Sequence, residues 1–201
     1  MSKLIKLLIF IILIGCGNSL GKNFHYIGDE KYNLASKREY NIWIDDKFGE
    51  MDRAAIDNGI MQWNYALNGN IKLVVKSYEF DMEISKLEEI VKEGGWLIFK
   101  IDSNNGMIVD RKSGVEQFHT LAWVDKIGGT KIWVVRERVK NEWMTGLMMH
   151  EIGHLLGAKH DKGLMRPHYR LEDYRCIDYE AISMVAEYQG IEIERLNYCI
   201  D

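Results

Sequence analysis

A histidine and glutamate cluster near residue 150 carries the clearest chemical signal in the sequence. His150 and His154 are four positions apart, so on a helix they lie on one face, one turn apart. Two imidazoles in that arrangement can bind one metal ion. Glu151 follows the first histidine and can reach a water molecule on that ion. The pattern therefore indicates a metal centre with a carboxylate beside it.

Gly157 and His160 extend this pattern to a third ligand. Gly157 can adopt a positive φ without steric penalty, so the chain can end the helix there and reverse. A continued helix would place His160 about 15 Å along the axis from His150, which is too far for a shared ion. Three neutral imidazoles without a thiolate favour zinc, with a fourth position open to water.

The expected chemistry is hydrolysis of peptide bonds by a zinc-activated water. Bound zinc lowers the pKa of that water from about 15.7 toward about 7. Glu151 is the candidate general base, which takes the proton and later delivers it to the leaving amine. The ion also polarises the scissile carbonyl and stabilises the developing oxyanion. One catalytic Zn²⁺ is therefore the expected cofactor.

The string from His150 to His160, H-E-x-x-H-x-x-G-x-x-H, resembles the signature of the metzincin zinc peptidases. That family has a methionine turn beneath the metal, and Met165 matches this methionine. The resemblance implies an α+β, zincin-like domain with a mixed twisted sheet of about five strands, an active-site helix, a Met-turn and a C-terminal helix. The competing interpretation, a buried helix with core histidines, has to account for all the motif positions at once.

Over residues 40–188 the chain is most similar to matrixin-type catalytic domains. Met165, Pro167 and Tyr169 resemble the Met-x-Pro-x-Tyr stretch that forms the wall of the S1′ pocket there. Leu121 and Ala122 resemble the Leu-Ala of the edge strand along which an extended substrate pairs. The resemblance thus implies substrate-binding roles for these residues.

The chain departs from matrixins at several positions. Trp123 stands where a matrixin histidine binds a structural zinc, so no structural zinc is expected. No cysteine lies between Cys16 and His150, so a cysteine-switch propeptide is missing. Asp161, after the third histidine, resembles the adamalysin pattern instead. Asp178 matches a family acid that braces the turn beneath the metal.

Three other functional interpretations stay open. In a gluzincin, the third ligand would be a glutamate from the next helix, such as Glu172 or Glu180. The chain could also be a non-catalytic surface lipoprotein on a retired protease fold, although intact Glu151 argues against this. A dedicated protease with a single partner substrate is the third possibility.

A calcium site is possible on composition but unsupported by spacing. Oxygen ligands are offered by a loop that contains Asp102, Asn104, Asn105 and Asp110. Their spacing matches no calcium-loop template, so a solvated polar loop is favoured.

The N-terminal segment, residues 1–15, reads as an export signal. Lys3 and Lys6 precede an apolar run at 7–14, which is too short to cross a hydrocarbon core about 30 Å thick. The run ends in Leu-Ile-Gly-Cys16, which resembles the bacterial lipobox. That resemblance implies cleavage before Cys16 and its lipidation, although an ordinary signal peptide would discard this cysteine. We expect an exported lipoprotein anchored to a bacterial membrane, at the periplasmic face or the cell surface, with a tether at 16–37 and a catalytic domain at 38–201.

Cys176 and Cys199 remain if Cys16 carries lipid. An extracytoplasmic compartment can be oxidising, so these two can form a disulfide. The sequence leaves two unpaired thiols equally open.

The helices and strands around the metal centre must hold its ligands in place. Hydrophobic periodicity predicts that these elements form one α+β domain. Strands are expected at 40–44, 71–78, 96–101, 121–124 and 132–135. The strand at 96–101 is nearly all apolar and is expected at the centre of the sheet. Helices are expected at 51–67, 81–93, 141–156 and 172–188, with Gly157 and Gly190 closing the last two.

Composition restricts the classes of partner. The chain has 201 residues and a formal net charge of −4, which suits one domain with its own core. No basic stripe indicates binding to nucleic acid. The expected partners are a protein or peptide substrate and, through the lipid anchor, a membrane. We expect a monomer.

Overall fold

A computed structural model describes residues 26–27, 38–78, 84–103, 120–167 and 176–199. The predicted export signal, Cys16, Tyr169 and Glu172 lie outside these residues. So do Asn104, Asn105 and Asp110, three of the four residues considered for calcium. Among the described residues, no helix is both long enough and apolar enough to cross a membrane.

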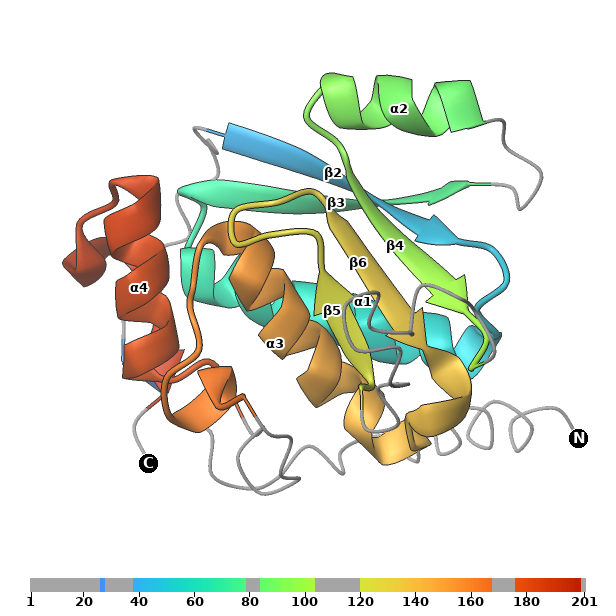
Figure 1. Cartoon of the computed structure of the whole chain (residues 1–201). Helices are drawn as coiled ribbons and strands as arrows, with labels where there is room; N and C mark the ends of the chain where they lie inside the picture. Colours follow the sequence, from blue (N-terminus) through green and yellow to red (C-terminus); the bar gives the residue numbers. More distant parts are fainter. Residues whose placement is uncertain (1–25, 28–37, 79–83, 104–119, 168–175, 200–201) are drawn as a thin grey trace, which may run out of the picture.

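A mixed five-stranded sheet forms the central layer of the domain (Figure 1). The strands are β2 (Arg38–Asp45), β3 (Ile71–Tyr78), β4 (Trp96–Ile101), β5 (Ala122–Val124) and β6 (Lys131–Val135). Their order is β3-β2-β4-β6-β5, and only β5 is antiparallel to its neighbour. The nearly all-apolar β4 is central, as the sequence predicts, because both of its faces are covered.

Helices lie on both faces of the sheet. They are α1 (Glu50–Leu67), α2 (Ile84–Lys92), α3 (Met144–Leu156) and α4 (Tyr179–Gln189). Helices α1 and α3 lie together beneath the sheet in Figure 1, α2 lies above it, and α4 stands beside the end of α3. A separate two-stranded pair joins β1 (Tyr26–Ile27) to β7 (Tyr198–Cys199).

The core lies between the sheet and the pair α1 and α3. Alternate strand residues point toward the helices and are almost fully buried: Ile42, Ile44, Ile98, Ile132 and Val134. Nearly every residue of α3 is buried, which fits a helix packed against the sheet, α1 and α4 at once. The helix that carries the two histidines is therefore held on most of its circumference.

Trp123 takes part in an aromatic stack on the opposite face of the sheet. Its ring centroid lies 5.8 Å from that of Trp133, and Trp133 lies 5.8 Å from Phe99. The rings of both pairs are nearly parallel, which is a favourable arrangement for aromatic side chains on adjacent strands. The position at which matrixins place a zinc-binding histidine thus contributes apolar packing here.

The last helix begins later than the sequence indicates. We expected helix from residue 172, with Asp178 inside it, but α4 starts at Tyr179. Asp178 is the N-cap, and its side chain accepts a hydrogen bond from the Ala181 N–H at 2.8 Å. An N–H in the first turn of a helix has no helical carbonyl to bind, and the Asp178 side chain supplies the missing acceptor. In the same way α3 is preceded by a 3₁₀ turn, η3 (Asn141–Trp143), where continuous helix was expected.

Cys176 and Cys199 form a disulfide, with their Cα atoms 6.2 Å apart. The Cys199 N–H also donates to the Ile177 carbonyl at 3.0 Å. The end of the chain is therefore tied to the segment that leads into α4.

Candidate metal centre

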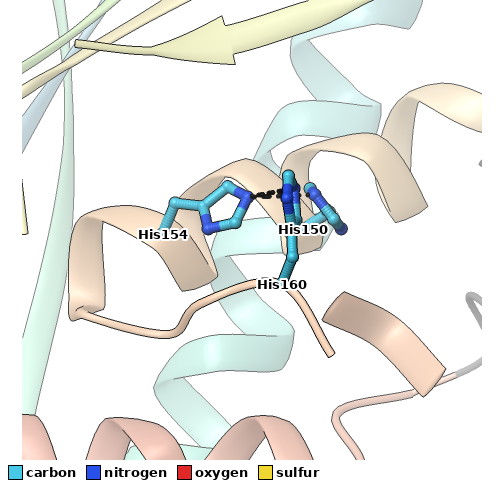
Figure 2. A group of neighbouring side chains, drawn as sticks. All are labelled: His150, His154 and His160. Carbon is cyan, nitrogen blue, oxygen red and sulfur yellow. Dashed lines mark hydrogen bonds between the residues drawn. The ribbon is translucent and has the colours of Figure 1, made fainter. Parts of the chain in front are cut away.

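Three imidazoles meet at the C-terminal half of α3 (Figure 2). The Nε2 atom of His154 lies 3.1 Å from the Nε2 atoms of both His150 and His160. Nitrogens that share one tetrahedral zinc at about 2.0–2.1 Å lie about 3.3 Å from one another. His150 and His154 are buried, whereas His160 is exposed. The cluster can therefore hold a metal ion that is open to solvent on one side.

Backbone carbonyls fix the orientation of the two buried rings. His150 Nδ1 donates to the Leu164 carbonyl at 2.7 Å, and His154 Nδ1 donates to the Ala158 carbonyl at 2.8 Å. A carbonyl can only accept, so the proton of each neutral ring sits on Nδ1. The Nε2 lone pairs then face one another, and a cation between them turns this arrangement from unfavourable to favourable.

Burial keeps these rings uncharged. It lowers the pKa of His150 to about 4, with a further contribution from neighbouring His154. Burial also lowers the pKa of His154. Both rings are therefore neutral near pH 7, which is the form that binds a metal.

Gly157 ends α3 in the left-handed conformation that the sequence predicts, with φ of 109°. The Gly157 N–H donates to the His154 carbonyl at 3.1 Å, and the Ala158 N–H donates to the Gly153 carbonyl at 2.9 Å. This pair of bonds is a Schellman motif. The same turn places the Ala158 carbonyl against the His154 ring and leads the chain back to His160.

Met165 lies beneath the centre in η4 (Gly163–Met165) and is fully buried. A Cβ on Gly153 would lie 2.8 Å from Met165 Sδ and 3.2 Å from Trp63 Cζ2, so only glycine admits these side chains against α3. Trp63 also donates its Nε1–H to the Met149 carbonyl at 2.8 Å. Sequence reasoning overlooked Gly153, although a glycine within a helix costs about 1 kcal/mol relative to alanine and hints at a packing role.

Asp178 braces the turn that contains Met165. Its Oδ2 accepts from the Leu164 N–H at 2.6 Å, while Oδ1 caps α4. Gly163, with φ of 57°, leaves room for this carboxylate, since a Cβ there would overlap Oδ2. Because Leu164 also accepts the proton of His150 through its carbonyl, one residue links Asp178 to the metal centre.

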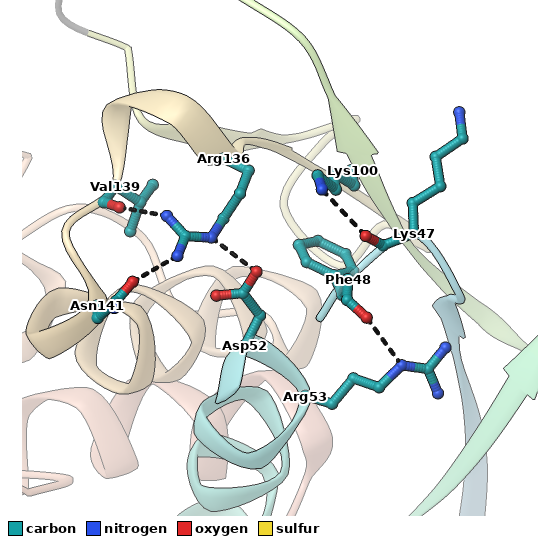
Figure 3. A network of polar contacts seen from close by, with 8 residues as sticks. All are labelled: Lys47, Phe48, Asp52, Arg53, Lys100, Arg136, Val139 and Asn141. Carbon is teal, nitrogen blue, oxygen red and sulfur yellow. Dashed lines mark hydrogen bonds and ion pairs between the residues drawn. The ribbon is translucent and has the colours of Figure 1, made fainter. Parts of the chain in front are cut away.

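An ion pair holds the approach to α3 (Figure 3). Arg136 lies 2.7 Å from Asp52 at the start of α1, and it donates to the Val139 carbonyl at 2.6 Å. Arg136 also bonds the side chain of Asn141, the first residue of η3. Both charged side chains are largely buried, so the pair is shielded from solvent. It ties the segment between β6 and α3 to α1.

Glu151 is buried on α3 next to His150, with 5% of its surface exposed. Burial raises the pKa of its carboxyl to about 8. A nearby cation favours the carboxylate and opposes this effect. Burial and a bound cation therefore act on the pKa of Glu151 in opposite directions.

Strand β5 lies beside α3, and among the described residues no strand pairs with its edge that faces away from β6. The Leu121 carbonyl accepts from the Val135 N–H at 2.8 Å and so faces β6. Successive residues of an antiparallel strand turn their backbone groups to opposite edges. Ala122 and, two residues further, Val124 therefore direct their N–H and C=O groups away from β6.

Glu180, an alternative third ligand, is engaged elsewhere. Its carboxylate pairs with Lys162 at 2.6 Å on the surface of α4. Among the described residues, the third nitrogen beside His150 and His154 belongs to His160. Pro167 is exposed at the end of the described segment that follows η4.

We predict that Asp178→Asn weakens metal binding. The Asp178 carboxylate accepts hydrogen bonds from the N–H groups of Leu164 and Ala181. An asparagine has only one side-chain oxygen and turns its N–H₂ toward one of these donors, so one donor is left unpaired at a cost of about 1–3 kcal/mol. The turn at Leu164 then holds His150 less firmly, and zinc affinity should fall about 10-fold or more. Zinc competition with a chromophoric chelator measures this loss. Unchanged affinity would show that Asp178 serves only as a helix cap.

The fold has a counterpart among solved structures. The chain matches the crystal structure of metalloproteinase-II from Bacteroides fragilis with a TM-score of 0.52 and 17% identity, over 84% of this chain and 59% of that one. It thus spans about three fifths of the length of that protein. No protein-family model matches the sequence, and neither does any curated protein. The chain has a metzincin-like fold, with a mixed five-stranded sheet and an active-site helix that brings His150 and His154 together with His160.

Proposed function

We propose that the protein is a zinc-dependent endopeptidase in which Glu151 acts as the general base. One observation carries the proposal: three imidazole nitrogens converge, with the protons of the two buried rings fixed on the far side, and the buried Glu151 follows His150 on the same helix. The metzincin-like fold supports the same assignment.

The donor set fits zinc. Three imidazole nitrogens without a thiolate, with His160 open to solvent, resemble the ligands of catalytic zinc sites that keep one position for water. A zinc ion bound there supplies Lewis-acid chemistry, because it polarises a carbonyl group and lowers the pKa of a water molecule to about 7. His150, His154 and His160 would hold it.

Glu151 handles the proton. A carboxylate accepts a proton from the attacking water and delivers it to the amine nitrogen as the peptide bond breaks. Burial raises the pKa of Glu151, which helps the carboxyl to hold the proton that it takes from water until the amine accepts it. The same residue can therefore act in both halves of the reaction.

The substrate is an extended segment of a protein or peptide. The outward-facing backbone groups of Ala122 and Val124 can pair with an extended chain, as an added strand does at a sheet edge. Pairing through the backbone is independent of side-chain identity and suits cleavage within a chain. By resemblance to matrixins, Leu121 joins this edge, and Pro167 and Tyr169 form the wall of the S1′ pocket.

We also propose an exported, lipid-anchored protein, with the lipid on Cys16. The export signal and the lipobox-like sequence support this, and so does the disulfide between Cys176 and Cys199, because such bonds persist in oxidising compartments outside the cytoplasm. In this arrangement residues 16–37, of which Tyr26–Ile27 pair with β7, link a monomeric catalytic domain to the membrane.

We predict that Glu151→Gln abolishes cleavage but retains the metal. Loss of a general acid–base group lowers kcat by about 10²–10⁴-fold. The zinc-loaded full chain in detergent solution is incubated with a diverse peptide library, and cleavage is read by mass spectrometry. Cleavage by the wild type alone, abolished by a chelator, is the expected result, and equal cleavage by both forms would contradict the role of Glu151.

The same experiment separates the alternative functions. Failure of the zinc-loaded wild type to cleave any library peptide would favour a protease with one dedicated substrate or a non-catalytic surface lipoprotein. That failure would contradict the proposal of a general endopeptidase.

We predict a pH-dependent stability difference between metal-free wild type and metal-free Glu151→Gln. The pKa of Glu151 rises from its ordinary 4.5 to about 8 on folding, so the folded state holds a proton that the unfolded state releases. The contribution of Glu151 to stability is therefore complete below pH 4.5 and declines as the pH rises toward 8. Glutamine has no such dependence.

Urea unfolding at several pH values between 5 and 8 measures the effect. The stability of Glu151→Gln relative to wild type should increase across this range, while the histidine contributions cancel in the difference. Parallel curves for the two proteins would contradict the raised pKa.

A further inference from the structure

The last turn of α4 packs against the end of α3. A Cβ on Gly157 would overlap the Cγ and Cδ1 atoms of Tyr188, and one on Gly128 would overlap the hydroxyl end of the same ring. The Tyr188 ring therefore lies across two glycines, one at the end of α3 and one in the turn between β5 and β6. Neither glycine can be replaced without moving this ring, and 55% of Tyr188 remains exposed on its outer side.

Hydrogen bonds reinforce the same junction. Gln189 donates from Nε2 to the Leu156 carbonyl at 2.9 Å, which satisfies one of the carbonyls left without a helical partner at the end of α3. Arg38 donates to Gln189 Oε1 at 2.9 Å and to its backbone carbonyl at 2.6 Å. Arg38 thereby holds the Gln189 amide so that its N–H₂ group faces the Leu156 carbonyl.

A hydrogen bond joins the β5–β6 turn directly to α3, the helix that carries His150 and His154. The Gly128 N–H donates to the His154 carbonyl at 2.8 Å, and the same carbonyl accepts from the Gly157 N–H. The edge of β5 that faces away from β6 is thus placed relative to α3 by a bond from the β5–β6 turn to the carbonyl of His154.

We propose that Tyr188 and Gln189 are positioning residues for the metal centre and for the substrate-binding edge. They fasten the turn at Gly157, and that turn supplies the Ala158 carbonyl that orients the His154 ring. His160 lies two residues beyond Ala158 in a non-helical segment, so its distance from His154 depends on the same turn. This inference rests on the proposed function. It adds to the site two residues that lie far from the three histidines in the sequence.

The position of β5 depends on the same contact. With the Tyr188 ring removed, Gly128 loses its covering group, and the β5–β6 turn keeps the bond to the His154 carbonyl without this packing. Substrate pairing at Ala122 should then weaken together with metal binding. A purely structural role for Tyr188 would instead lower the stability of the fold and leave the metal site as it was.

The test compares three variants of the full chain loaded with Co²⁺, whose visible absorption reports the geometry of its ligands. Tyr188→Ala removes the ring, and Tyr188→Phe keeps it. Tyr179→Ala is the matched control: Tyr179 is on the same helix, is 50% exposed and packs on Tyr198. Co²⁺ affinity is measured by chelator competition, and thermal unfolding is recorded for each variant.

Tyr188→Ala is expected to lower Co²⁺ affinity about 10-fold or more and to alter the absorption band, in line with other residues that orient metal ligands. Tyr188→Phe and Tyr179→Ala should match the wild type. Where activity is measurable, Tyr188→Ala should also raise KM, because the edge strand is displaced. If Tyr188→Ala does not fold, Gln189→Met decides, since it removes the bond to Leu156 at similar side-chain length and should lower affinity several-fold.

Wild-type affinity and spectrum in Tyr188→Ala, or in Gln189→Met where that variant decides, would overturn the inference and leave the proposed function intact. An equal loss of affinity in Tyr179→Ala would also overturn it, since the effect would then be general destabilisation. Absence of Co²⁺ binding by the wild type would instead overturn the proposed function, and the inference with it.

Discussion

The structure depends on holding three imidazole nitrogens within reach of one another, two of which are the unprotonated Nε2 atoms of the buried His150 and His154 rings. His154 Nε2 is 3.1 Å from its two neighbours, and no proton on the buried rings relieves the contact because each Nδ1 is already bonded to a carbonyl. Such lone pairs repel without a cation. The protein must therefore supply the restraining contacts, and a bound metal ion provides the favourable counterpart.

These restraints come from turns that need glycine. Gly157 reverses the chain with positive φ and presents the Ala158 carbonyl to His154. Gly163 makes space for the Asp178 carboxylate, which fixes the Leu164 segment under His150. Gly153 admits Met165 against the helix. Gly157 and Gly163 thus permit polar contacts that orient a histidine, and Gly153 permits close packing against the helix that carries His150 and His154.

Much of this was predictable from the sequence, because the relevant signals are local. The spacing from His150 to His160, with Gly157 between them, encodes a helix, a stop and a reversal, and alternating apolar residues encode the strands. Local patterns do not predict contacts between distant segments, and the brace from Asp178 to the turn at Leu164 was expected only from the resemblance to the family. The start of α4 at Tyr179 depends on Asp178 facing an N–H at Ala181 and a turn far from it in sequence. The packing of Tyr188 on Gly128 and Gly157 leaves no local pattern, since each residue alone is unremarkable.

The most direct test of the central claim is the zinc content and affinity of His160→Ala beside the wild type, measured on the folded, full-length chain. The account predicts one tightly bound zinc per wild-type chain and a loss of affinity of at least about 10-fold in the variant, because the third nitrogen of the cluster is removed. Retention of zinc at wild-type affinity by His160→Ala would contradict the three-histidine centre and show that another residue supplies the third ligand.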